Sequence, residues 1–174
     1  MARTVPGHES GASAQPGRPG LHDLHLGSTG EPKGTLCPHR SLVNLVLDQR
    51  VRFRFGPDDA IALNIPVSFD GSVYEIFMPL VSGGRLIIPK PDEHKEVAEF
   101  IELIKRRRVT SMVALHSMLV PLFSDPRIEE CRSLRLLLSG GESLLPDLVR
   151  RIRQALPDME LFHVYGPTEA AVLV

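Results

Sequence analysis

Short, wholly apolar segments alternate with segments of helical periodicity along most of the chain, and this alternation constrains the fold more than any other feature. The expected strands cover residues 60–67, 85–89, 111–115, 134–141 and 159–164. The expected helices cover residues 41–53, 71–84, 96–108, 116–123 and 146–156. Strands without a polar side are buried on both faces, so the pattern predicts an α/β fold with a mostly parallel sheet flanked by helices. Ligands of such sheets bind beyond the carboxyl ends of the strands, so the residues that follow each strand are the candidates for a site.

Composition narrows the classes of partner. With 174 residues, of which 43% are hydrophobic, the chain can bury one core, and its net charge of -1 gives no case for nucleic acid. Cys37 and Cys131 lie far apart and match no metal or redox spacing, which suits a reduced, cytoplasmic protein. No apolar run approaches the roughly 20 residues that span a bilayer, so no membrane partner is expected.

The amino-terminal segment differs from the rest of the chain. Residues 1–20 are dense in Gly, Pro and Ser and have no periodic apolar face. Such a segment buries too little surface to offset the entropy lost on ordering it. We therefore expect a disordered leader over residues 1–22 and a folded domain over residues 23–174.

The first motif with chemistry is the segment GSTGEPKG, residues 27–34. Small residues let backbone N–H groups approach an anion, and hydroxyls and Lys33 add further donors, as in a loop that cradles phosphate. The segment is not a Walker A motif, because Gly34 follows Lys33 where that motif has Ser or Thr. A plain flexible turn fits the same residues.

The second motif is SFDGS, residues 68–72, between an expected strand and an expected helix. A carboxylate at Asp70 suits a cationic ligand group such as an ammonium, and Tyr74, about one helical turn further on, is placed to line the same cavity. A structural role is also open, because Asp is a favoured helix cap and Ser72 with Glu75 fits a capping box.

Two further motifs follow the last two expected strands. SGGE, residues 139–142, permits close approach of a flat ligand or forms a tight turn. YGPTE, residues 165–169, offers an aromatic face, a hydroxyl and a carboxylate, which suit a base, a phosphate and Mg²⁺. A Gly-Pro turn in which Thr168 caps the next helix explains the last motif equally well.

Taken together and in this order, GSTGEPKG, FDGS, SGGES and YGPTE resemble the motifs of the adenylate-forming enzymes, which bind AMP. FDGS followed by VYEIF is most similar to the amino-acid adenylation domains of nonribosomal peptide synthetases. The resemblance runs from Gly27 to Val174 and implies an internal fragment of that domain's large subdomain. The family's N-terminal part and its small C-terminal subdomain, which carries a catalytic lysine, are expected to be absent.

The resemblance also implies roles for individual residues. Those that would contact ATP are Gly27, Ser28, Thr29, Gly30, Lys33, Gly34, Gly141, Glu142, His163, Tyr165, Gly166 and Thr168. Those that would contact the amino acid are Phe69, Asp70, Gly71, Tyr74, Val113, Leu138, Gly140, Val164, Val172 and Leu173. The catalytic set would be Lys33, Thr168 and Glu169, with Glu169 as the Mg²⁺ ligand. The amino-acid set is almost wholly apolar, with Tyr74 as its polar group, and favours an uncharged, apolar or aromatic amino acid.

The implied function is ATP-dependent activation of an amino acid as its aminoacyl adenylate, with release of pyrophosphate. In the family the acyl group then passes to the phosphopantetheine thiol of a carrier domain, and no carrier motif occurs in this chain. Two departures from the family pattern stand out. His25 and Leu26 replace hydroxyl residues before the first motif, and His163 stands where Asn usually meets the adenine; simple strand packing is the alternative for His163.

Two other functions stay open from the sequence. One is an acyl-CoA synthetase-like ligase that acts on a carboxylic acid without an amine. The other is a non-catalytic remnant or interaction module, because a chain without the family's C-terminal lysine is expected to be weak or inactive alone. The abrupt join between the leader and the first motif further suggests a mis-assigned start or a frame error.

Overall fold

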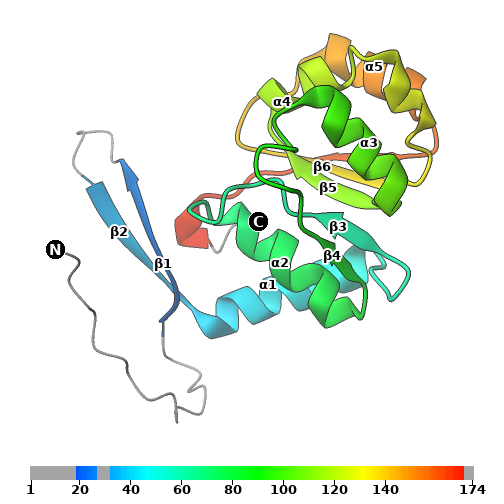
Figure 1. The fold of residues 1–174 in the computed structure, drawn as a ribbon. Coiled ribbons are helices and arrows are strands. Elements are labelled where there is room, and N and C mark those ends of the chain that lie inside the picture. The colour runs from blue at the N-terminus through cyan, green and yellow to red at the C-terminus, as the bar shows by residue number, and fades with distance from the viewer. Residues whose placement is uncertain (1–18, 27–31, 171–174) are drawn as a thin grey trace, which may run out of the picture.

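A parallel sheet of five strands forms the centre of the computed structural model, which describes residues 19–26 and 32–170 (Figure 1). Its strands are β3 (Ala60–Ala62), β4 (Arg85–Ile87), β5 (Ser111–Ala114), β6 (Leu136–Ser139) and β7 (Glu160–His163), in the order β4-β3-β5-β6-β7. Every pairing within it is parallel. The predicted α/β class with a parallel sheet is therefore confirmed, and each strand lies within its expected range but is shorter.

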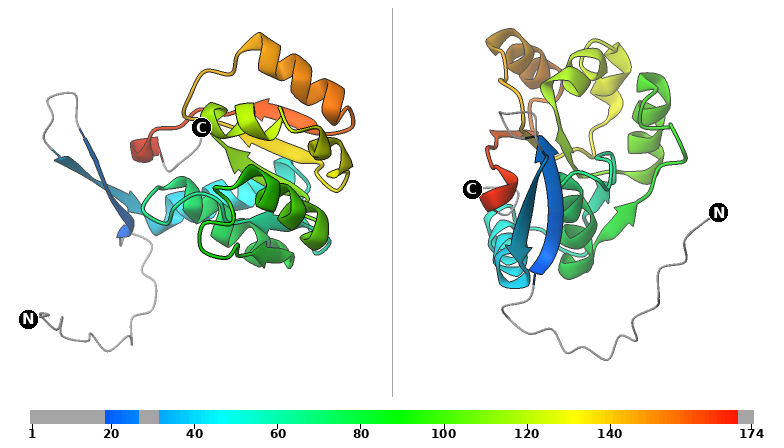
Figure 2. Two further views of the ribbon diagram at one scale, coloured as in Figure 1. Left: turned by 45° about the horizontal axis from the view of Figure 1, so that its top comes forward. Right: turned by 90° about the vertical axis from the view of Figure 1, so that its left-hand side faces the viewer.

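Helices cover both faces of this sheet (Figures 1 and 2). One face carries α1 (His39–Arg52) and α2 (Gly71–Ser82), and the other carries α3 (Val97–Arg107), α4 (His116–Leu122) and α5 (Pro146–Ala155). Successive side chains of a strand point to opposite faces. On β6, Leu137 accordingly packs with the α3–α5 core, whereas Leu136 and Leu138 pack with the core beneath α1 and α2. A strand with two buried faces must be apolar throughout, as the sequence pattern indicated.

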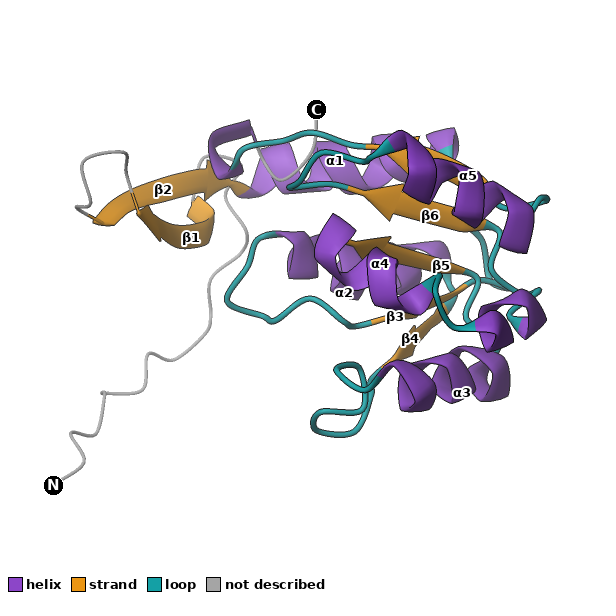
Figure 3. Cartoon of the chain, turned by 90° about the horizontal axis from the view of Figure 1, so that it is seen from above, coloured by secondary structure: helices purple, strands orange, loops and turns teal. Residues whose placement is uncertain are grey.

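A two-stranded antiparallel hairpin precedes the sheet. It consists of β1 (Pro19–Leu26) and β2 (Pro32–Pro38), and it lies on the side of the molecule toward which the parallel strands point (Figure 3). β2 lies beside the short 3-10 turn η2 (Thr168–Ala170), as the right-hand view of Figure 2 shows. We expected residues 1–22 to be disordered, and this is wrong for residues 19–22, which belong to β1. Their backbone groups pair with β2, and the composition of a segment taken by itself does not reveal such a partner. Residues 1–18 of that expected leader lie outside the described residues.

The helix ends show where local signals were sufficient. Pro38, in extended backbone conformation, directly precedes α1, and Gly83, with a φ of 75°, ends α2 in the left-handed conformation that glycine adopts without strain. The capping box that the sequence left open for Ser72 and Glu75 does not form at the start of α2. Ser72 Oγ donates to the carbonyl oxygen of Phe69 at 2.7 Å, and Glu75 is turned into the core instead of back toward the helix end.

Within the described residues, no helix combines the length and the apolar character needed to cross a membrane.

A second 3-10 turn, η1 (Pro126–Glu130), connects α4 to β6. It packs against α3 and α5 and so completes the cover of the face that carries α3, α4 and α5.

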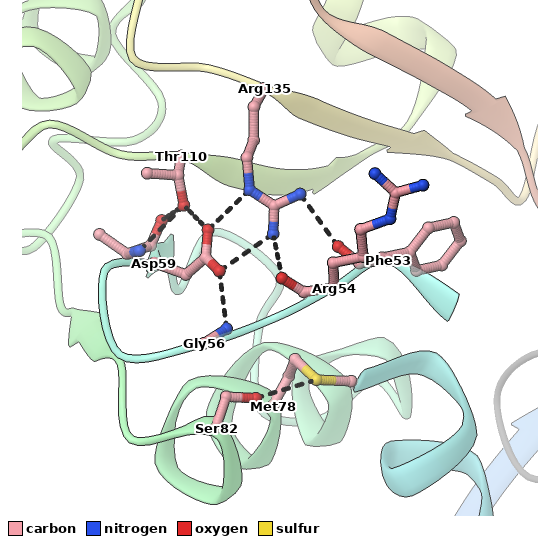
Figure 4. A network of polar contacts seen from close by, with 9 residues as sticks. Phe53, Arg54, Gly56, Asp59, Met78, Ser82, Thr110 and Arg135 are labelled. Carbon is pink, nitrogen blue, oxygen red and sulfur yellow. Dashed lines mark hydrogen bonds and ion pairs between the residues drawn. The ribbon is translucent and has the colours of Figure 1, made fainter. Parts of the chain in front are cut away.

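A partly buried ion pair joins the amino ends of three strands (Figure 4). The Asp59 carboxylate, just before β3, accepts from Arg135 Nε at 2.8 Å, from the Thr110 hydroxyl at 2.7 Å and from the Gly56 N–H at 2.9 Å. Arg135 also donates to the carbonyl oxygen of Phe53 at 3.0 Å. Burial alone raises the pKa of Asp59, but the hydrogen bonds from Arg135, Gly56 and Thr110 outweigh it and lower the pKa below its ordinary value.

We expect Asp59→Ala to lower the free energy of unfolding by about 3 kcal/mol, because it leaves the Arg135 guanidinium and two further donors without their acceptor. Urea denaturation measures this directly. Asp48→Ala is the control, since it removes an exposed pair with Arg52 on α1 and should cost at most about 0.5 kcal/mol. Equal losses in the two variants would mean that the buried network adds nothing specific.

Candidate functional site

A cavity of about 370 Å³ opens at the carboxyl ends of the parallel strands. After β3 the chain forms β4 on one side of it and then crosses over to form β5 on the other side, so the strand order reverses at β3. Crevices at such reversals are the usual ligand sites of open α/β sheets. The lining residues are Asn64, Ile65, Pro66, Phe69, Asp70, Gly71, Tyr74, Val113, Ala114, Leu115, Met118, Gly140, Gly141, Val164 and Gly166.

Asp70 is the only acidic or basic residue among those lining residues. It directly precedes α2 in helical conformation, and its carboxylate does not cap the helix. Within the described part of the chain, no side chain forms a hydrogen bond or ion pair with this carboxylate. The pKa of Cys37, at the end of β2, is raised mainly by burial and also by the charge of the nearby Asp70. The cavity therefore presents one uncompensated negative charge to a ligand.

Two glycines after β6 allow neighbouring segments to approach closely at the rim. A Cβ on Gly140 would lie 3.0 Å from Val164 Cγ2, and a Cβ on Gly141, which has a φ of 75°, would lie 2.8 Å from Leu115 Cδ2. A side chain at Gly140 would press on the Val164 backbone, whose carbonyl oxygen would lie 3.1 Å from the Cβ, and one at Gly141 would be strained by the positive φ. The glycines thus keep backbone groups, rather than side chains, at this part of the rim.

Beneath the cavity, the fully buried Glu75 of α2 supports the segment that leaves β3. Its Oε2 accepts from the N–H groups of Asn64 at 3.0 Å and Ile65 at 2.9 Å. Asn64 Nδ2 in turn donates to the carbonyl oxygen of Val113 at 2.8 Å, which ties the β3 side of the cavity to the β5 side. Burial raises the pKa of Glu75 to about 8, although backbone N–H groups of Ile65, Asn64 and Val113 oppose the shift.

Tyr74 borders the cavity, as predicted. The side chain is 1% exposed, and its hydroxyl is buried without a hydrogen-bond partner among the described residues. The ring packs edge-on against Phe55, with ring centroids 6.3 Å apart. Burial raises the pKa of the phenol far above its ordinary value, so it stays neutral. The cavity wall is consequently uncharged at this position.

The structure brings together most of the residues that the sequence assigned to the amino acid. Those that line the cavity are Phe69, Asp70, Gly71, Tyr74, Val113, Gly140 and Val164, joined by Gly141 and Gly166 from the ATP set. Leu138 is not among them, because it is fully buried in the core under α1 and α2. Val172 and Leu173 lie outside the described residues.

Other residues of the predicted ATP set lie away from this cavity. The Glu142 carboxylate accepts from the N–H of Ser117, 2.8 Å away, at the start of α4. His163 lines a separate hollow of about 860 Å³ between α1 and β7. The Tyr165 side chain is 73% exposed.

The phosphate-loop motif is only partly described. Lys33 and Gly34 pair through their backbones with His25 and Leu24 in the hairpin, so this end of the motif is a strand and not a turn. Gly27, Ser28, Thr29 and Gly30 lie outside the described residues. Thr168 and Glu169 form η2 beside β2. No cluster of three or more metal-ligating side chains occurs within residues 19–26 and 32–170.

Sequence reasoning missed part of the cavity wall. Asn64, Ile65 and Pro66 follow β3, and Leu115 and Met118 follow β5. A local signal existed, since each group comes directly after an expected strand. It was overlooked because apolar residues in such a position read as a continuation of the strand or as the next helix.

Known proteins resemble this chain over most of its length. The family model described as AMP-binding enzyme matches residues 27–174. Tyrocidine synthase 3 of Brevibacillus parabrevis is 38% identical over 146 residues, which cover 84% of this chain and 2% of that protein. Phosphinothricin tripeptide synthetase PhsB of Streptomyces viridochromogenes is 36% identical over 148 residues, which cover 85% of this chain and 12% of that protein.

Solved structures of nonribosomal peptide synthetases have the same fold. The chain aligns with FmoA3 in its alpha-methyl-L-serine-AMP bound form with a TM-score of 0.82 and 31% identity, over 91% of this chain and 18% of that one. It aligns with PA1221, which contains adenylation and PCP domains, with a TM-score of 0.81 and 27% identity, over 99% of this chain and 34% of that one. The chain thus spans a small part of the length of its relatives.

The buried carboxyl group of Glu75 makes stability depend on pH. Its pKa is raised from 4.5 to about 8, so between these values the folded protein holds a proton that the unfolded chain releases. The free energy of unfolding should therefore fall as pH rises through this window, by an amount on the order of 4 kcal/mol, and the contribution is complete only below the lower value.

Urea denaturation of the wild type and of Glu75→Gln from pH 5 to pH 8.5 tests this. The variant cannot titrate at this position, so its stability should vary much less over the window. Glu99→Gln, on the exposed side of α3, should follow the wild type. Parallel curves for the wild type and Glu75→Gln would show that the buried carboxyl is already ionised at low pH.

Proposed function

Because this chain belongs to the AMP-binding enzyme family, we propose that it takes part in activating an amino acid as an aminoacyl adenylate at the expense of ATP. One observation supports this proposal most. An otherwise uncharged, largely apolar cavity at the carboxyl edge of the sheet carries a single carboxylate, Asp70, with no partner among the described residues. An α-ammonium group is the complementary ligand, because a charge-assisted hydrogen bond is strongest where water is partly excluded.

In this proposal the amino acid enters with its ammonium at Asp70 and its side chain in the cavity. Phe69, which is 62% exposed, borders the boundary between amino acid and nucleotide. The remaining walls are largely apolar, with Val113 and Val164 among them, whereas Asn64 is polar. Their character favours an uncharged, apolar or aromatic side chain over a charged one, because no charged residue other than Asp70 lines the cavity to offset the cost of desolvation.

The residues at the rim fit a nucleotide. Gly140 and Gly141 leave backbone without side chains there, and the exposed Tyr165 ring follows Val164 and offers a face for stacking. Lys33 and the residues of the motif before it would contact the β- and γ-phosphates, and the Thr168 hydroxyl would contact the α-phosphate. Glu169 supplies the kind of carboxylate oxygen that Mg²⁺ prefers. Bound Mg²⁺ would neutralise part of the phosphate charge.

The reaction implied is a displacement at phosphorus. An oxygen of the amino-acid carboxylate forms a bond to the α-phosphorus of ATP, while the bond from that phosphorus to the leaving pyrophosphate oxygen breaks. Asp70 contributes by fixing the zwitterion so that its carboxylate faces the nucleotide, and Thr168 by holding the α-phosphate. The acceptor of the activated acyl group is proposed to be the phosphopantetheine thiol of a carrier domain, a partner supported by the adenylation and PCP domains of PA1221.

We expect Asp70→Asn to weaken amino-acid binding by about 10- to 100-fold, because the charged acceptor of the ammonium is lost. NMR titration of the chain with single amino acids, and separately with MgATP, measures both affinities. MgATP affinity should stay within about twofold of the wild type, since Asp70 contacts only the amino acid. Asp158→Asn, exposed on the loop before β7, is the control and should change neither affinity.

Analogues that lack the amine separate this function from its alternative. If the corresponding acid without an amine binds as well as the amino acid, and Asp70→Asn has no effect, then the chain belongs with ligases of amine-free acids. If neither MgATP nor any amino acid binds, the chain is a non-catalytic remnant. Pyrophosphate exchange in the presence of the preferred amino acid then reports whether bound substrates also react.

A further inference from the structure

The wall of the cavity lies where the sheet stops. β3 and β5 pair through Ile61 and Ser111, and no later pairing joins them. The segment from Asn64 to Asp70 therefore leaves the sheet without a neighbouring strand to hold it. Its backbone N–H groups nevertheless start in the interior, where an unpaired donor is costly, so some other group must satisfy them.

Glu75, in the second turn of α2, accepts the hydrogen bonds of these N–H groups. One carboxylate oxygen accepts from two successive N–H groups, those of Asn64 and Ile65, at 3.0 and 2.9 Å. The side chain is fully buried, so water does not compete for these bonds. Asn64 then extends the connection to the β5 side through its bond to the Val113 carbonyl.

These contacts form one continuous path from Glu75 to the substrate cavity. Asn64, Ile65 and Val113 all line it, and Asp70 stands at the far end of the segment that Glu75 holds. Glu75 is not itself among the lining residues. Resting on the proposed function above, we infer that Glu75 is a positioning residue for amino-acid recognition, which sets the place of Asp70 and of the β3 side of the cavity by holding the backbone of Asn64 and Ile65.

Substitution of Glu75 should affect the binding of the amino acid and not the binding of MgATP. Loss of the acceptor should free the Asn64–Asp70 segment and misplace the carboxylate that meets the ammonium. The nucleotide is proposed to sit on the loops after β6 and β7, which Glu75 does not contact. Amino-acid affinity should therefore fall by about tenfold or more in Glu75→Leu, while MgATP affinity stays within about twofold of the wild type.

Graded variants distinguish positioning from general damage. Glu75→Gln keeps one oxygen acceptor at the same reach and should retain amino-acid affinity within about threefold. Glu75→Asp keeps the acid but is one methylene shorter, cannot reach both N–H groups, and should behave like Glu75→Leu. Asp59→Asn is the matched control, because it changes a buried carboxylate that also accepts a backbone N–H, but at the amino end of the sheet.

The experiment is NMR titration of each variant with the preferred amino acid and with MgATP, together with amide hydrogen exchange at residues 64 and 65. The inference predicts faster exchange at both amides and a selective loss of amino-acid affinity in Glu75→Asp and Glu75→Leu, with neither effect in Asp59→Asn. It is overturned if folded Glu75→Asp binds the amino acid like the wild type, or if both affinities fall together. If the wild type itself binds no amino acid, the proposed function fails and this inference fails with it.

Discussion

Buried backbone groups at the ends of very short parallel strands need partners, and the carboxyl groups of two side chains supply them. The strands of the main sheet contain three or four residues each, so the ladder of backbone hydrogen bonds stops soon after it starts. At the amino edge Asp59 accepts from Gly56 N–H, and at the carboxyl edge Glu75 accepts from Asn64 and Ile65 N–H. The rest of the architecture depends on these two ends being held in place.

The two carboxylates work in opposite electrostatic settings. Asp59 is paired with Arg135, which lowers the pKa of Asp59, so this pair at the amino ends of the strands stabilises the fold. Glu75 has no such cation, and burial raises its pKa. At the same carboxyl edge Asp70 is left without a partner among the described residues, where a ligand can meet it. The charge is therefore paired within the protein at the amino ends of the strands and left without a partner among the described residues at their carboxyl ends.

Much of the fold and part of the candidate site were predictable from local patterns. Apolar runs located the five strands, and Pro38 and Gly83 marked helix ends, because each of these signals acts within a few residues. Motifs directly after strands located Asp70, Gly140 and Gly166 at the cavity, because the ends of parallel strands meet at one edge.

Local patterns were misleading where a side chain has its hydrogen-bond partners in a segment distant in the sequence. Ser72 and Glu75 have the spacing of a capping box, but the Glu75 carboxyl group accepts hydrogen bonds from the backbone of the segment that follows β3.

The sequence by itself determined the class of fold and the order of its elements, since both follow from periodicity and from residues near in the chain. It also predicted which loops carry the candidate site residues, through residue types that suit an ammonium and a phosphate. Only the tertiary structure decided which of those residues share a cavity. Leu138 is buried below it, Glu142 bonds Ser117, and the apolar residues Ile65 and Met118 form its wall. The physical reason is that burial and hydrogen-bond partnership arise between segments distant in sequence, and no local pattern encodes which segment will supply the partner.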